Sequence, residues 1–201
     1  MAEQVFVSEG LAERKRMYAQ AAAETIAKLA PPNRVCVQAG GHIGLWPLAL
    51  ANYFTVYTFE PSERNWKVLQ KAVAGIPNII ALPAGLGDKA GTATVREGKK
   101  SGLDHLDLYC PGSVKVVTID SLKLSSVAAI VLDVEGMEHL ALKGAINTIK
   151  QSHPLIWIEL TSRQKFYGST VGATAAWVQS LGYDGPTRVF KRDVYFRWRG
   201  K

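Results

Sequence analysis

The stretch VCVQAGGHIG, from Val35 to Gly44, decides the fold of this chain. Its alternating apolar residues predict a strand over 35–39 that runs directly into a glycine-rich loop, and a helix is predicted over 45–53. Glycines let the backbone approach a ligand closely, and the start of a helix offers free amide groups. In an open parallel sheet, ligands bind beyond the carboxyl ends of the strands. The loop is therefore a candidate binding turn, although such glycines also occur in ordinary turns.

The rest of the chain repeats the order of strand and helix. Strands are predicted over 56–60, 79–83, 129–134 and 155–160, and helices over 62–73, 137–151 and 172–181. Two further strands are predicted on either side of a long polar stretch, over 92–95 and 114–119, and the alternating tail 182–201 predicts a hairpin. This order is typical of an α/β fold with a parallel sheet and helices on both faces.

Composition limits the class of protein. The 201 residues are 47% hydrophobic, which suffices for one domain with a sizeable core, and Pro31-Pro32 ends a predicted helix over 8–30. Two distant cysteines, Cys36 and Cys110, argue against a disulfide framework or a zinc site and fit a reducing compartment. Because neither a signal peptide nor an apolar run of roughly 20 residues is visible, we expect a cytoplasmic protein without a membrane partner.

Glu60 narrows the choice of ligand. It ends the second predicted strand about 20 residues beyond the glycine loop, where an acidic side chain commonly accepts hydrogen bonds from ribose hydroxyls. The alternative is a carboxylate that caps the next helix, although Ser62 can fill that role as well. Together the loop and Glu60 favour a ligand that contains a nucleoside, but they do not separate NAD from S-adenosylmethionine.

The stretch VLDVEGMEHLALKGA, from Val131 to Ala145, makes that separation. A buried apolar strand runs into Asp133 and Glu135, which can share a face of the strand, and Glu138 follows them. Carboxylates are costly inside a sheet unless they are paired or lie at its open end. We therefore expect them at the mouth of the sheet, beside the glycine loop. As an alternative, Glu135 and Glu138 complement the N-terminus of the helix that follows.

Four stretches form a recognisable pattern over about 33–198: FEP at 59–61, the 131–145 stretch, PLIWIEL at 154–160 and LGY at 181–183. In these stretches the sequence resembles the FkbM-type S-adenosylmethionine-dependent methyltransferases. The resemblance implies a Rossmann-like class I methyltransferase sheet of seven mostly parallel strands with an antiparallel last strand. It implies methyl transfer from S-adenosyl-L-methionine, usually to a hydroxyl of a sugar, glycan or natural product. The chain would then join an N-terminal helical segment, 1–32, to a methyltransferase region, 33–201, within one domain.

The resemblance also implies a cofactor site. The residues expected there are Gln38, Ala39, Gly40, Gly41, His42, Gly44, Glu60, Pro61, Gly85 and Leu86. The chain departs from the family at two of these positions, since Gln38 replaces a common Asp and His42 a common Asn. Gln38 can orient the cofactor's amino-acid end by hydrogen bonds, but it offers no negative charge to the ammonium group. A family member that binds the cofactor without catalysis is therefore an open alternative.

Three carboxylates are the candidate catalytic residues: Asp133, Glu135 and Glu159. A hydroxyl acceptor gains from a base that removes its proton, and Asp133 is the first choice for that role because it ends the central strand. Glu135 is the second choice, whereas Glu159 has the alternative of an ion pair with Arg163 or Lys165. The three carboxylates could together hold a magnesium ion, but nothing in their spacing demands one, and we expect no metal.

Two segments bear on the chemical identity of the acceptor, the tail 182–201 and the polar stretch 96–112. The net charge is +7, and basic and aromatic residues interleave in the tail as they do in proteins that bind nucleic acid. A hairpin explains the aromatic residues without nucleic acid, and an RNA 2′-O-methyltransferase typically has a lysine where this chain has Glu159. We therefore expect a small-molecule or glycan acceptor rather than RNA. The polar stretch, with Asp104 and His105, is either a lid over the acceptor or a solvated loop.

Overall fold

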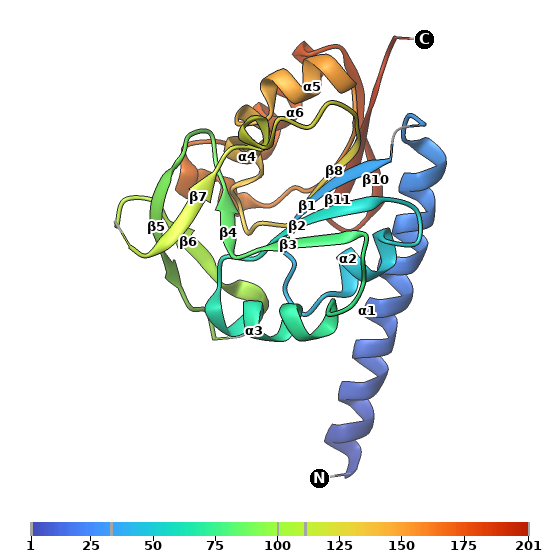
Figure 1. The fold of residues 1–201 in the computed structure, drawn as a ribbon, viewed down its shortest axis with the longest axis vertical. Helices are drawn as coiled ribbons and strands as arrows, with labels where there is room; N and C mark the ends of the chain where they lie inside the picture. Colours follow the sequence, from blue (N-terminus) through green and yellow to red (C-terminus); the bar gives the residue numbers. More distant parts are fainter. Residues whose placement is uncertain (1, 33, 100, 111, 201) are drawn as a thin grey trace.

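The computed structural model describes residues 2–32, 34–99, 101–110 and 112–200. At its centre lies a seven-stranded sheet in the order β10-β11-β9-β8-β1-β2-β3 (Figure 1). The strands are β1 (Val35–Ala39), β2 (Thr55–Phe59), β3 (Ile79–Leu82), β8 (Val127–Leu132), β9 (Leu155–Glu159), β10 (Tyr183–Phe190) and β11 (Asp193–Trp198). Neighbours from β9 to β3 pair in parallel, and β11 runs antiparallel to β9 and β10. The predicted mostly parallel sheet with an antiparallel last strand is confirmed.

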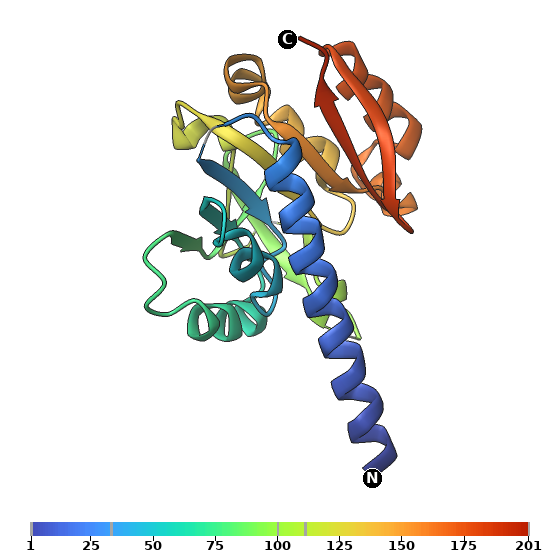
Figure 2. The same cartoon turned by 90° about the vertical axis from the view of Figure 1, so that its right-hand side faces the viewer.

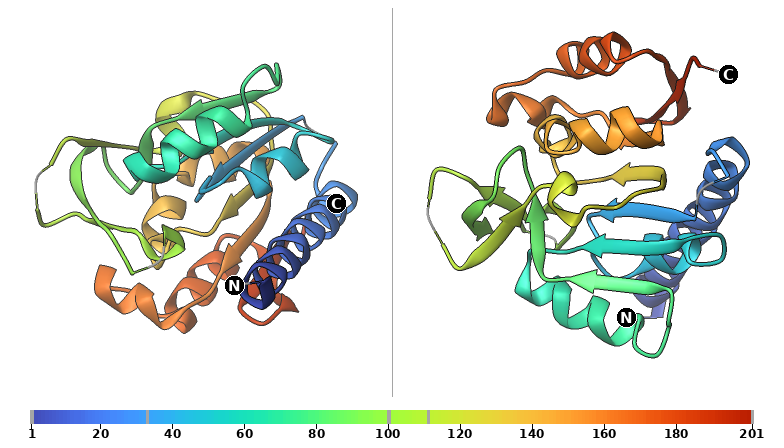
Figure 3. Two further views of the ribbon diagram at one scale, coloured as in Figure 1. Left: turned by 90° about the horizontal axis from the view of Figure 1, so that it is seen from below. Right: turned by 45° about the horizontal axis from the view of Figure 1, so that its top comes forward.

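Helices cover both faces of this sheet (Figure 3). On one face, α1 (Ala2–Leu29) and α2 (Leu45–Leu50) pack in a cluster that includes Val131 and Trp157. On the other face, α4 (Glu138–Lys143), α5 (Ile146–Ser152) and α6 (Val171–Ser180) pack in a cluster that includes Ile130 and Ile156. Adjacent strand residues enter different clusters because successive side chains point to opposite faces of a sheet.

The first helix is longer than the sequence predicts. It begins at Ala2 rather than at Ser8, because neither glycine nor proline interrupts 2–9. Towards its C-terminus, the buried Ala19, Ala22 and Ala23 let it lie close to the sheet, and its N-terminal turns extend beyond the rest of the molecule (Figures 1 and 2). Among the described residues, no helix combines the length and the hydropathy that crossing a membrane requires.

A second sheet of four strands lies beside the first, in the order β4-β7-β5-β6. Its strands are β4 (Ala84–Leu86), β5 (Gly91–Arg96), β6 (His105–Asp107) and β7 (Val114–Val117), with a short helix η1 (Ser101–Leu103) before β6. The sequence predicts only β5 and β7. Within the polar stretch, β6 pairs antiparallel with β5, and its Leu106 packs against Ala93, Val116 and Met137. A strand of three residues is too short for its periodicity to be recognised.

The helix predicted over 137–151 is in fact two helices, α4 and α5, which meet at Gly144. A Cβ atom at Gly144 would lie 2.0 Å from the carbonyl oxygen of Gly87, so only glycine permits this close approach to the segment after β4. The start of α5 is capped by Asp120, which lies in the short helix η2 (Ile119–Leu122). The carboxylate of Asp120 accepts hydrogen bonds from the amides of Asn147 and Thr148 at 3.0 and 2.8 Å. Such a cap favours a fresh helix start at this point.

Candidate active site

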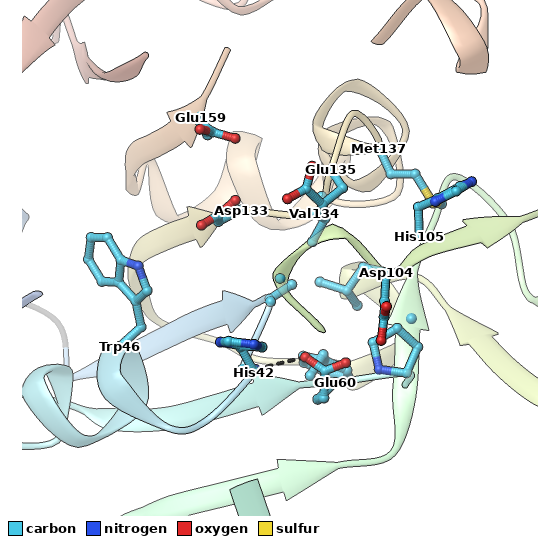
Figure 4. A pocket seen from close by; sticks show the side chains of 18 of the residues that line it. His42, Trp46, Glu60, Asp104, His105, Asp133, Val134, Glu135, Met137 and Glu159 are labelled. Carbon is cyan, nitrogen blue, oxygen red and sulfur yellow. Dashed lines mark hydrogen bonds between the residues drawn. The ribbon is translucent and has the colours of Figure 1, made fainter. Parts of the chain in front are cut away.

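A cavity of about 290 Å³ lies beyond the carboxyl ends of β1, β2, β8 and β9 (Figure 4). These strands are parallel, so the residues that follow them meet at one edge of the sheet. The predicted site residues that line the cavity are Ala39, Gly40, Gly41, His42, Glu60, Pro61, Gly85, Leu86, Asp133, Glu135 and Glu159. The fold thus brings together all of the predicted site residues except Gln38 and Gly44.

The glycine loop follows a path that only glycine allows. Gly40 has a φ of 84°, and a Cβ atom there would lie 2.0 Å from the carbonyl oxygen of Asp133. The amides of Gly40 and Gly41 both donate to the carbonyl oxygen of Phe59, at 3.1 and 3.0 Å. Gly44 turns the chain into α2 with a φ of 95° and does not line the cavity. The loop is thereby fixed against β2 and β8, with its backbone at the cavity wall.

Glu60 is both a structural link and a wall of the cavity. Its buried carboxylate accepts one hydrogen bond from the amide of His42 at 2.7 Å and another from the amide of Ser62 at 2.9 Å. Burial raises the pKa of Glu60, although these two hydrogen bonds act in the opposite direction. Since each carboxylate oxygen can accept more than one hydrogen bond, Glu60 retains acceptor capacity towards the cavity. The capping role and the ligand-binding role are therefore compatible.

Asp104 closes the same side of the cavity. Its carboxylate accepts hydrogen bonds from Ser62 Oγ at 2.7 Å, from Arg64 Nε at 2.8 Å and from the amide of Gly98 at 2.9 Å. Burial alone would raise the pKa of Asp104, but these hydrogen bonds outweigh it and hold the pKa below its ordinary value. The loop before β6 is in this way fixed to the start of α3 (Glu63–Ala72). Nothing in the sequence pairs Arg64 with Asp104.

Gln38 does not reach the cavity. Its side chain is buried, with its amide nitrogen donating to the carbonyl oxygen of Ala39 at 2.9 Å and its oxygen accepting from the hydroxyl of Thr58 on β2. The expectation that Gln38 contacts the cofactor therefore finds no support in this geometry. Its observed contacts join the ends of β1 and β2 below the glycine loop.

Four carboxyl groups gather at the opposite end of the cavity, from Asp133, Glu135, Glu159 and Asp193 (Figure 4 shows the first three). Asp193 was not predicted as a site residue. It begins β11 and accepts a hydrogen bond at 2.7 Å from the hydroxyl of Tyr18 on α1, which also lines the cavity. The two residues are 175 positions apart, so only the tertiary fold brings them together.

Arginines pair with two of these carboxylates. Arg192 lies 2.9 Å from Glu159, and Arg163 pairs with Glu135. The suggested pairing of Glu159 with Arg163 or Lys165 is therefore wrong, because the hairpin turn between β10 and β11 places Arg192 beside the end of β9. For Asp133, the described residues include no hydrogen-bond or ion-pair partner of the carboxyl group.

The crowding of these groups changes their acidity. Burial, and then the neighbouring charges of Glu159, Glu135 and Asp193, raise the pKa of Asp133 to about 7. Burial also raises the pKa of Glu159 to about 7, against the opposing charge of Arg192. A carboxyl group with a pKa near neutrality is a suitable general base because it accepts a proton readily and is still partly ionised. The described residues contain no group of three or more His, Cys, Asp or Glu placed to hold a metal ion.

Glu138 holds the turn that leads into α4. It is fully buried, and its carboxylate accepts hydrogen bonds from the amides of Val134 and Gly136 at 3.1 and 3.2 Å. It does not line the cavity, and its role is structural, because it serves amides of the turn before α4. Glu135, in contrast, has a φ of 55° and lines the cavity rather than capping α4. The strained turn of 133–136 thus separates a structural carboxylate from the carboxylates at the cavity.

Comparisons with known proteins agree with this geometry. Residues 38–184 match the family model described as the Methyltransferase FkbM domain. No curated protein sequence matches the chain. The methyltransferase FkbM from Methylobacillus flagellatus KT is similar in structure, with a TM-score of 0.56 and 20% identity, and the match covers 82% of this chain but only 44% of that one. An rRNA methylase from Streptococcus thermophilus has a TM-score of 0.51 and 12% identity, over 89% and 95% of the two chains. At these identities, the structural likenesses show the fold alone.

Proposed function

The chain belongs to the FkbM methyltransferase family, and from this premise we propose that it transfers a methyl group from S-adenosylmethionine to a hydroxyl acceptor. The proposed acceptor is a sugar, a glycan or a small natural product. One observation carries the proposal. A single cavity joins the glycine loop and Glu60 at one end to Asp133 and Glu159 at the other. This is the arrangement that a nucleoside cofactor and a proton-losing acceptor require.

The residues around the glycine loop fit such a cofactor. Glu60 would accept hydrogen bonds from ribose hydroxyls, and the backbone of 39–42 would hold the amino-acid end. Leu86 and Leu106 offer apolar side chains against which the adenine base of the cofactor can pack. When bound, S-adenosylmethionine supplies an electrophilic methyl group on a sulfonium. The protein's contribution is then to position the acceptor, to hold water out and to receive a proton.

In this proposal, Asp133 receives the proton of the acceptor hydroxyl. Its carboxyl group has free acceptor capacity, whereas the carboxylates of Glu135 and Glu159 are held by arginines. With a pKa of about 7, Asp133 is partly ionised at neutral pH and can serve as a general base. Glu135 and Glu159 would orient the acceptor through hydrogen bonds to its other hydroxyls.

The two alternatives have less support. The case for an inactive family member rested on Gln38, which lacks the negative charge of an aspartate. In the structure, the side chain of Gln38 is enclosed beside Thr58 and does not line the cavity, so the missing charge does not alter the cavity wall. The case for RNA rested on the basic tail. Two of its cations are paired with carboxylates, Arg192 with Glu159 and Arg199 with Asp184, which reduces the charge available to a phosphate backbone.

An acceptor screen with a radiolabelled methyl donor tests the proposal. We expect label to enter hydroxyl compounds from a panel of sugars, glycans and natural products, and not to enter RNA oligonucleotides. The Asp133→Asn variant should lose incorporation, and Asp88→Asn, which changes an exposed aspartate outside the cavity, should keep it. Label that enters only RNA, together with oligonucleotide binding that is tight at low salt and falls steeply with added salt, would favour an RNA methyltransferase instead.

A further inference from the structure

A second cavity, of about 480 Å³, lies next to the first. It is formed between β6 with the residues after it and the short helix η3 (Ser162–Tyr167). Its apolar wall consists of Leu103, Leu106, Leu108, Tyr109, Phe166 and Tyr167. Both walls come from segments that lie outside the seven-stranded sheet. They are the kind of variable segments in which specificity is usually placed.

The walls of this cavity are held in place by a defined contact. The hydroxyl of Tyr167 donates a hydrogen bond at 2.7 Å to the carbonyl oxygen of Leu106, which joins η3 to β6. Leu106 is buried and packs in the cluster beneath the second sheet. Two aromatic side chains, Tyr109 and Phe166, are nevertheless 86% and 65% exposed. Exposed aromatic rings beside a fixed apolar cavity indicate a surface that covers apolar groups of a ligand.

The two cavities adjoin and share part of their walls. His105, Leu106 and Glu135 line both of them. The first cavity, at about 290 Å³, lies at the lower end of the range that small-molecule sites occupy. A cofactor that joins a nucleoside to an amino acid would take up much of this space, so we expect an acceptor that reaches Asp133 to extend into the adjoining cavity.

We propose that the second cavity receives an alkyl or aromatic arm of the acceptor, so that the substrate is amphipathic, with its polar methylated part beside Asp133. The ion pair between Glu135 and Arg163 lies where the cavities meet, and both residues line the second cavity. This boundary separates the carboxylates around Asp133 from the aromatic side chains around Phe166. The inference rests on the proposed function, because it assigns the acceptor's polar end to the methyl-transfer cavity.

Binding of two model glycosides to the protein saturated with S-adenosylhomocysteine tests this inference. The probes are octyl β-D-glucoside, used below its micelle concentration, and methyl β-D-glucoside, which has the same sugar without the arm. We expect octyl glucoside to bind at least about tenfold more tightly, because its chain leaves water on binding. Phe166→Ala and Tyr109→Ala should each weaken octyl glucoside binding by about three- to tenfold. Tyr53→Ala removes an exposed aromatic ring outside both cavities and should leave that binding unchanged.

Equal binding of the two glucosides, or no binding of octyl glucoside, would overturn the inference. So would octyl glucoside binding that Phe166→Ala and Tyr109→Ala leave unchanged or that Tyr53→Ala reduces equally. If S-adenosylhomocysteine itself fails to bind, the proposed function fails, whereas its normal binding without octyl glucoside binding removes only the amphipathic acceptor.

Discussion

Glu60 shows how one side chain can serve the fold and the ligand together. Its two oxygens accept hydrogen bonds from the amides of His42 and Ser62, which sets the distance between the glycine loop and the start of α3. A ribose bound beside it would meet a carboxylate already fixed in place, so little entropy is lost in ordering the side chain. The strand-end position of Glu60 suggested both roles; the structure shows the hydrogen bonds to the two amides, and the contact with ribose stays a prediction.

Replacing Glu60 by Gln should weaken binding of S-adenosylhomocysteine by about 1–3 kcal/mol, because hydrogen bonds to a charged carboxylate are lost. The amide group also points a donor at one of the two backbone amides that Glu60 now serves. Glu63→Gln is the matched control, since this exposed carboxylate on α3 pairs with Lys67 and does not line the cavity. Calorimetry measures both. Unchanged affinity in a folded Glu60→Gln protein would leave Glu60 as a cap alone.

Asp133→Asn should lower turnover by about 10²–10⁴-fold while leaving the affinity for S-adenosylhomocysteine nearly intact. Since a general base has to be ionised, turnover of the wild type should rise with pH through about 7, the pKa to which burial and the neighbouring carboxylates raise Asp133. The residual activity of Asp133→Asn should lack that rise if Asp133 alone causes it. A variant that stays fully active on an identified acceptor would show that Asp133 is not the base, and Glu159→Gln would then be measured in the same way.

At the scale of elements, the large strands and helices were predictable and the small ones were not. β1 extends over the predicted residues because an apolar strand that ends in glycines has clear boundaries. β4 and β6 have three residues each, and the break at Gly144 depends on the nearby carbonyl of Gly87, which lies far away in sequence. Local patterns carry no information on such contacts, so the second sheet and the divided helix appear only in three dimensions.

The hairpin of β5 and β6 should depend on the contact between Arg64 and Asp104. Arg64→Ala leaves the buried carboxylate of Asp104 with fewer donors, which we expect to lower the local stability of the hairpin. Hydrogen exchange of the amides in 97–99 and 101–106 should therefore become faster than in the wild type. Arg96→Ala is the control on the same hairpin, because its pair with Asp107 is more exposed, is screened by solvent and should contribute less to stability. Equal exchange in the two variants would contradict an anchoring role for Asp104.

At the scale of the whole molecule, the cavity is closed by parts of the chain that are remote in sequence. Tyr18 of α1 and Asp193 of β11 meet across its acidic end, next to the residues that follow the parallel strands. The edge of a parallel sheet and the acidic residues that follow its strands were predictable, since both can be recognised in the sequence. The contributions of α1 and of the terminal hairpin were not, because nothing in either segment marks it as part of a site.

Gln38 is a second case in which the sequence did not reveal a side chain's contacts. A residue at the end of β1 next to the glycine loop was a reasonable candidate for the cofactor, but the pleat of the strand directs its side chain to Thr58. Periodicity assigns a face of the sheet only when the neighbouring elements are known. The role of Gln38 in the fold therefore follows only from the structure. The carboxylates at the open end of the sheet were predictable, because burying an unpaired carboxylate inside the sheet is costly in free energy.

The most direct measurement of the central claim is calorimetric titration of the 201-residue chain with S-adenosylhomocysteine and, separately, with NAD. If the cavity beyond β1, β2 and β8 holds a methyl-transfer cofactor, S-adenosylhomocysteine binds at one site per chain and NAD gives no signal. The Glu60→Gln substitution then weakens the binding of S-adenosylhomocysteine by about 1–3 kcal/mol. Clear binding of NAD together with no heat from S-adenosylhomocysteine would contradict the account.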